Sequence, residues 1–116
     1  MDIREIAEDF ARLCAEGRVQ EAVRTYWSPD IATFEPVPGE WAETRGIEQA
    51  MAKMTWWREN HEIHEIDVEG PWVNGNQFTL YWEIEMTPKD GETEDLEEIV
   101  LYTVEDGKIV EERYFY

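Results

Sequence analysis

The chain has 116 residues, with 28 acidic and 10 basic side chains and a formal net charge of -18. This length fits one domain with one core, spanning residues 1–116. Hydrophobic residues make up 42% of the chain and aromatic residues 13%, which excludes a disordered acidic segment. A field this negative repels phosphate backbones and anionic lipid surfaces, so we expect neither nucleic acid nor a membrane as a partner.

Cysteine content indicates the compartment. Cys14 is the only cysteine, so no disulfide can form within the chain, and it falls on the apolar stripe of a predicted helix. We therefore expect a buried thiol and a reducing, cytoplasmic location. The N-terminal sequence MDIREIAEDF lacks a cationic or apolar signal region, and no run approaches the roughly 18 apolar residues of a membrane span.

Apolar residues recur at helical spacing in three segments of the first half of the chain. These predicted helices cover residues 3–14, 19–26 and 47–57. Asp2 and Glu5 form a capping pair for the first helix, and Gly17 is a natural stop after it. The sequence SPD at residues 28–30 ends the second helix, because the residue before a proline is pushed out of the helical region.

Most of the remaining chain reads as strands. Residues 31–35 form a brief predicted strand, and the loop at 36–46, with its two prolines and two glycines, should be ordered though irregular. Residues 78–87 alternate almost strictly between apolar and polar, as in a strand with one buried face. Turns are predicted at VNGN (73–76), KDGE (89–92) and EDGK (105–108). Helices followed by an antiparallel meander predict an α+β domain whose helices cover one face of a curved sheet.

The apolar pattern of the strand before the last turn indicates that a second copy of the protein packs on the sheet. Residues 99–104 leave neither strand face clearly polar, so both faces should be covered. The helices can cover one face. A second protomer is the simplest cover for the other, because a monomer rarely leaves such a patch in water. We therefore predict a homodimer.

Three stretches and the order of elements carry a family resemblance: SPDIATFEPVPG (28–39), the WxxxHxxHxxxVEGP run (57–71) and the ending VLYTVEDGKIVEERYFY (100–116). They resemble the SnoaL-like and ketosteroid-isomerase-like branch of the nuclear transport factor 2-like superfamily, over essentially the whole chain. The resemblance implies a cystatin-like cone, with three N-terminal helices packed on a curved, mostly antiparallel sheet around an apolar pocket. The superfamily includes isomerases, polyketide cyclases, dehydratases and binding domains, so the fold does not define one activity.

The resemblance also implies site residues and chemistry without a metal or organic cofactor. In the ketosteroid isomerase, an Asp base acts with a Tyr and a protonated Asp that stabilise the enolate. Glu35 takes the position of that base, and Phe10 stands where the oxyanion tyrosine would be. The second acid falls near Val100, or at Glu98 if the hairpin register is shifted by two residues. With two of the three roles unmatched, steroid isomerisation as such is not expected.

The chemistry of the two carboxylates supports the same candidates. Glu35 ends an apolar strand, and a water-poor cavity would disfavour its charged form and bring it towards the range of a general base. The alternative is a solvent-facing glutamate at a strand end. Glu98 shares a face with Val100 and Tyr102, which predicts an inward acid unless the strand twists it towards solvent.

The segment HEIHEI at residues 61–66 holds both histidines. Residues three apart on a strand point to opposite faces, and no third histidine completes a zinc set, so we expect no metal site. His64 shares parity with Ile66 and Val68, which predicts that it points inward as a proton shuttle or ligand donor. A hydrogen-bonded core histidine is the alternative.

Tryptophans gather around the presumed pocket mouth: Trp41, Trp56, Trp57, Trp72 and Trp82. Such rings bury a large area and can stack on a flat ligand. The predicted ligand-binding residues are Phe10, Trp41, Trp57, Trp82 and Tyr102. The sequence thus predicts a protein that binds a hydrophobic or aromatic small molecule, with acid-base catalysis of the isomerase or cyclase type. The alternative is a non-catalytic ligand-binding or dimerisation domain.

Overall fold

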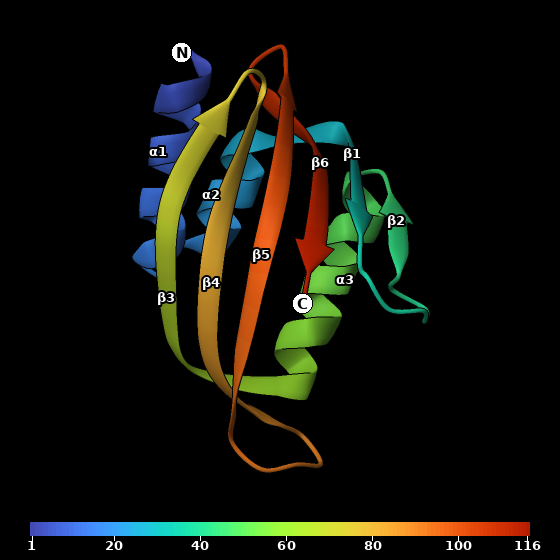
Figure 1. Ribbon diagram of the computed structural model, residues 1–116. Helices are drawn as coiled ribbons and strands as arrows, with labels where there is room; N and C mark the ends of the chain where they lie inside the picture. The colour runs from blue at the N-terminus through green and yellow to red at the C-terminus, as the bar shows by residue number, and fades with distance from the viewer.

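The computed structural model describes residues 1–116 as three helices packed on one face of a six-stranded sheet (Figure 1). The helices are α1 (Ile3–Ala15), α2 (Val19–Tyr26) and α3 (Ile47–Asn60). The strands are β1 (Trp27–Phe34), β2 (Glu43–Arg45), β3 (His61–Asn74), β4 (Gln77–Pro88), β5 (Glu94–Glu105) and β6 (Lys108–Phe115). The α+β class and the three helices predicted from the sequence are confirmed.

The sheet is mixed but mostly antiparallel, as predicted. Its strands lie in the order β2-β1-β6-β5-β4-β3, and only β1 and β6 pair in parallel. The long connection through α3 and the meander allows this parallel pair. The register places Trp82 of β4 opposite Glu98 of β5, and Tyr102 of β5 opposite Glu112 of β6. These four side chains share the inner face of the sheet, on which the helices pack.

The helices differ in how firmly they are buried. In α1, Asp2 accepts a hydrogen bond from the Glu5 backbone N–H at 2.9 Å, and Glu5 accepts one from the Asp2 backbone N–H at 3.2 Å. This is the predicted capping box, and α1 buries a full face beyond it. In α3, by contrast, only Ala50 among 14 residues is buried. The other apolar side chains of α3 border open space.

An aromatic cluster forms part of the core between α1 and the sheet. Phe10 lies 6.1 Å from Phe78 and 5.1 Å from Tyr102 between ring centroids, and Phe78 stacks on Tyr102 at 4.7 Å. All three residues are at most 2% exposed. The cavity begins beyond this cluster, because Phe10 and Tyr102 line it and Phe78 does not.

Three local features differ from the prediction. Strand β1 begins at Trp27, four residues before the predicted strand, and β2 forms inside the segment predicted as an irregular loop. Strand β3 has a bulge at His64, which has no partner on β4. A bulge places one extra residue in a strand, so side chains beyond it no longer follow simple alternation.

The outer face of the sheet exposes large apolar side chains. Trp72 is 58% exposed, Ile99 47% and Phe115 49%. Trp72 therefore lies on the outer surface, which corrects its predicted place at the pocket mouth. No helix in the structure combines the length and the apolar character needed to cross a membrane.

Candidate functional site

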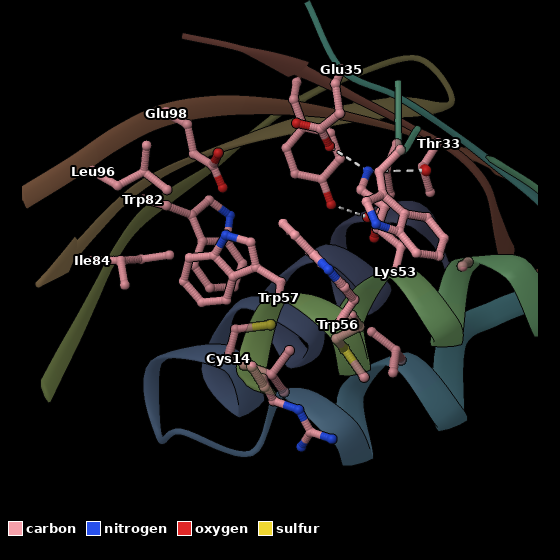
Figure 2. Close-up of a pocket in the computed structure, with 18 of the residues that line it drawn as sticks. Cys14, Thr33, Glu35, Lys53, Trp56, Trp57, Trp82, Ile84, Leu96 and Glu98 are labelled. Atoms are coloured by element: carbon pink, nitrogen blue, oxygen red, sulfur yellow. Dashed lines mark hydrogen bonds and ion pairs between the residues drawn. The ribbon is translucent and has the colours of Figure 1, made fainter. Parts of the chain in front are cut away.

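A cavity of about 1090 Å³ lies between the inner face of the sheet and the helices. Of its 37 lining residues, 21 are hydrophobic, so an apolar ligand would bury much of its surface there. Figure 2 shows side chains from the strands and from α3 pointing into this shared space. The few polar groups among them are therefore the candidates for chemistry.

Glu98 points from β5 into the cavity (Figure 2). Its side chain is partly buried and has neither a hydrogen-bond donor nor a cation bound to it. Burial raises the pKa of Glu98 to about 7; the negative charges of Glu35 and Glu112 add to the rise, and Lys53 opposes it. A carboxyl group with this pKa can release or accept a proton near neutral pH.

Glu35 lies at the cavity wall just after β1, but both of its oxygens are occupied. One oxygen forms an ion pair with Lys53 of α3, and the other accepts a hydrogen bond from the Tyr116 hydroxyl at 2.8 Å. Lys53 also donates to the Thr33 hydroxyl at 3.1 Å and lies 4.5 Å from the centroid of the Tyr114 ring. The Glu35 and Lys53 side chains are only 14% and 15% exposed. Glu35 is thus one half of a largely buried ion pair.

The loop after Glu35 fixes the end of the strand. The Glu35 backbone N–H donates to the Ala42 carbonyl at 2.8 Å, which closes the loop between them. Pro36 and Pro38 restrict the backbone inside this loop because their rings fix one dihedral angle. This geometry directs the Glu35 side chain towards α3, where Lys53 meets it (Figure 2).

Glu112 is a third carboxylate at the cavity, and it is only 3% exposed. Its two oxygens accept hydrogen bonds from the Trp27 indole N–H at 2.7 Å and from the Tyr114 hydroxyl at 2.6 Å. Burial raises the pKa of Glu112, and the hydrogen bonds from Tyr114 and Trp27 oppose that rise. Glu112 is therefore a bonded structural carboxylate.

The five aromatic residues predicted to bind ligand all line the cavity: Phe10, Trp41, Trp57, Trp82 and Tyr102. The Trp82 indole N–H donates to the Tyr102 hydroxyl at 3.1 Å, which fixes both side chains on the inner face of the sheet. Trp57 stacks on His61 with ring centroids 4.5 Å apart. The cavity thus has aromatic walls on both the sheet and the helix side.

His64 lies outside the cavity, which corrects the prediction that it points inward. Its Nε2 atom is 2.7 Å from the Thr87 hydroxyl, at an exposed position. The bulge at His64 lets Ile63 and Ile66 both face the cavity although they are three residues apart. The histidine that lines the cavity is His61.

The arrangement of the side chains favours neither a metal site nor a nucleophilic thiol. No group of three or more His, Cys, Asp or Glu side chains is arranged to hold a metal ion. Cys14 is buried at the cavity wall, where burial raises the pKa of its thiol well above the usual range. Such a thiol is a poor nucleophile, because the reactive form is the thiolate.

Two residues of the site were not singled out from the sequence. Lys53 had a usable signal, since it lies three residues after Ala50 and four before Trp57 on the face of α3 that borders the cavity. For Glu112, the simple alternation of side chains along β6 gave no signal that it faces inward. It faces inward together with Ile109 because the pairing of β5 with β6 also shifts by one residue.

Residues 1–116 match a family model described as a SnoaL-like domain. A crystal structure from Mesorhizobium loti, of a proposed SnoaL-like polyketide cyclase also labelled a carbohydrate phosphatase, is 46% identical, with 100% of each chain covered and a TM-score of 0.98. No protein with a curated description matches the chain.

Two more distant structures share the fold. A protein of unknown function with a cystatin-like fold from Xanthomonas campestris is 22% identical over 99% of this chain and 90% of its own, with a TM-score of 0.80. A Catenulispora acidiphila protein with a ketosteroid isomerase-like fold, solved in complex with trimethylamine, is 18% identical over 97% and 85%, with a TM-score of 0.76. At these identities the likeness shows the fold alone.

Proposed function

The chain belongs to the SnoaL-like domain family, and we propose that it binds a hydrophobic or aromatic small molecule in the cavity and transfers a proton on that ligand through Glu98. The observation that carries the proposal is an unpartnered carboxyl group on an apolar cavity wall. Isomerisation and cyclisation both need a proton to be removed and returned, which a single carboxyl group can do without a cofactor.

The base in this proposal is Glu98 and not Glu35, the residue that the family resemblance implies. A pKa of about 7 keeps a large share of Glu98 in either protonation state at neutral pH. Glu35 would first have to leave Lys53 before it could accept a proton. We assign Glu35 the role of holding Lys53 at the cavity wall.

A proton-exchange assay tests the catalytic part of the proposal. β-Tetralone, an aryl ketone with acidic C–H bonds, would be incubated with the protein in D2O and followed by proton NMR. Glu98→Gln should slow the exchange by about 100-fold. Glu97→Gln removes the same charge at an exposed position and should keep the wild-type rate. Equal rates for wild type and Glu98→Gln would exclude Glu98 as the base.

A binding assay tests the ligand site separately. N-phenyl-1-naphthylamine is neutral and apolar, and its fluorescence should rise when it enters the cavity. Leu96→Trp places a larger side chain at the cavity wall and should weaken this binding by about 10-fold. Binding without any accelerated exchange would favour the alternative, a non-catalytic ligand-binding domain.

We also propose that two copies pair through the outer face of the sheet. Ile99 and Phe115 are neighbours in the β5–β6 register, and both are exposed, as is Trp72. Apolar patches of this kind often mark protein interfaces. Light scattering after size exclusion should give a dimer for the wild type and a monomer for Ile99→Glu. A monomeric wild type would overturn this part of the proposal.

A cytoplasmic location is proposed from the cysteine. Cys14 is free and buried, and the chain has no partner for a disulfide. Proteins without disulfides are typical of reducing compartments. Fractionation of the native cells with an antibody against the chain tests this proposal, and recovery in a secreted fraction would overturn it.

A further inference from the structure

The charges inside the cavity do not balance. Three carboxylates border its inner part against one cation, Lys53. Lys53 is paired with Glu35, and Glu112 is held by two hydrogen-bond donors. Glu98 is left without a partner. When Glu98 is ionised, its charge is partly buried among mostly hydrophobic residues, and this costs free energy that a ligand of opposite charge would offset.

The cations at the rim of the cavity do not change this balance. Three exposed arginines lie at the rim: Arg18 just before α2, Arg24 on α2 and Arg58 on α3. Arg18 is already bound to Glu16 and Glu21 at 2.9 and 2.6 Å. Exposed charges are screened by solvent and contribute little inside the cavity.

Aromatic surface lies beside the unpaired carboxyl group. Trp82 is the β4 neighbour of Glu98 and shares its face of the sheet. Figure 2 shows Glu98 pointing from β5 towards the side of the cavity where Trp57 of α3 lies. The Trp82 N–H is already bound to Tyr102, so the part of this side chain that borders the cavity has no free hydrogen-bond donor. Indole faces attract cations that approach within about 6 Å of the ring centroid.

The net charge of the whole chain also favours a cationic ligand. A net charge of -18 creates a negative potential that concentrates cations and repels anions. An anionic ligand would meet both this potential and Glu98. A neutral ligand would leave the charge of Glu98 uncompensated. A cation is the ligand class that both features favour.

We propose that the ligand of this cavity is an organic ammonium ion with an apolar or aromatic body, its positive charge held between Glu98 and the ring surfaces of Trp57 and Trp82. The inference rests on the proposed function, since it names the class of small molecule that the cavity binds. A bound cation favours the ionised form of Glu98, so Glu98 is the proton acceptor in the complex.

Two probes of the same shape test the charge. Benzyltrimethylammonium carries a fixed positive charge, and neopentylbenzene replaces its nitrogen by carbon. Their affinities would be measured by displacement of N-phenyl-1-naphthylamine at about pH 8.5, above the pKa of Glu98 of about 7. The wild type should bind the cation about 10-fold more tightly than its neutral counterpart. Glu98→Gln should lose about 10-fold for the cation and less than about 2-fold for the neutral probe.

Glu97→Gln serves as the matched control, because it removes one charge from the outer face and should leave both affinities unchanged. Equal affinity of the wild type for the two probes would overturn the inference and leave the binding function intact. If neither of the two probes nor N-phenyl-1-naphthylamine bound to the wild type, the proposed function and the inference would both be overturned. An equal loss in Glu97→Gln and Glu98→Gln would show that the whole-chain field selects the cation, and would overturn the assignment to Glu98.

Discussion

Glu35, just after β1, and Glu98, on β5, border the same cavity, and their surroundings give them different chemistry. Glu35 has an ion pair on one oxygen and a hydrogen bond on the other. Glu98 lies beside Trp82 with no donor, and burial raises its pKa to about 7. The counter-ions and hydrogen bonds around a carboxylate, more than its place at the end or middle of a strand, decide whether it can exchange a proton.

The largest effect is expected on the Glu35 side of this comparison. Lys53→Met would leave Glu35 as an unpaired charge in a mostly buried place. We expect the free energy of unfolding to fall by roughly 3 kcal/mol, measured by urea denaturation at neutral pH. The stability contributed by Glu35 requires Lys53, whereas Glu98 has no ion-pair partner whose removal could destabilise the fold.

A double variant provides the control for Lys53. Glu35→Gln combined with Lys53→Met removes both charges, so most of the lost stability should return. If the double variant were as unstable as Lys53→Met alone, the lysine would act through packing of its side chain. The ion pair would then not be what separates Glu35 from Glu98.

The next effect concerns Glu98 and depends on pH. Between the ordinary value of 4.5 and about 7, the folded protein holds a proton on Glu98 that the unfolded chain has released. Raising the pH through this window therefore destabilises the folded state, and the full cost is present above pH 7. Glu98→Gln cannot ionise, so it should be more stable than the wild type by roughly 2 to 3 kcal/mol at pH 8.

At pH 4 the wild type and Glu98→Gln should agree within about 0.5 kcal/mol, since both side chains are then neutral. Denaturation curves at the two pH values measure the difference, and Glu97→Gln should show no such pH dependence. A Glu98→Gln protein that gains nothing at pH 8 would mean that Glu98 is solvated like its exposed neighbour, and the comparison would fail.

A smaller effect is expected from the bonded carboxylate Glu112. Tyr114→Phe removes the hydroxyl that donates to Glu112 at 2.6 Å and keeps the ring beneath Lys53. The free energy of unfolding should fall by about 1.5 to 2 kcal/mol, because one oxygen of a buried carboxyl group loses its hydrogen-bond donor. Tyr81→Phe is the control, since its hydroxyl donates to exposed Glu83 at 3.1 Å. Equal losses in the two variants would contradict this reasoning.

The smallest effect is expected at Tyr116. Its hydroxyl donates to Glu35 at 2.8 Å, but the residue is 54% exposed, so water can replace the bond. Tyr116→Phe should change the free energy of unfolding by less than about 0.5 kcal/mol in thermal or chemical denaturation. A loss near that of Lys53→Met would show that the second oxygen of Glu35 matters as much as the ion pair.

Local signals explain why much of the fold could be predicted. Helical spacing and the Asp2–Glu5 capping pair define α1, and the Asn-Gly turn at 74–75 joins β3 to β4, as the structure confirms. Strand β2 was missed because three residues have little periodicity of their own. Its pairing with β1 is a tertiary contact that no local pattern shows.

The site was harder to predict because it joins distant segments. Alternation along β5 was enough to place Glu98 on the same face as Tyr102. The partner of Glu35 lies 18 residues away on another element, and no spacing rule links a strand end to Lys53. His64 was placed on the wrong face because parity assumes an unbroken strand. A bulge depends on the neighbouring strand and cannot be read from one segment alone.

The bulge at His64 also determines what the deletion of one residue would do to the cavity wall. If this one residue were deleted, Ile63 and Ile66 would stand two apart and would still face the cavity under ordinary alternation. The local bend that a bulge adds to its strand would be lost. A single deletion at this position would therefore change the curvature of the wall and the room for a ligand while leaving the side chains of the lining the same.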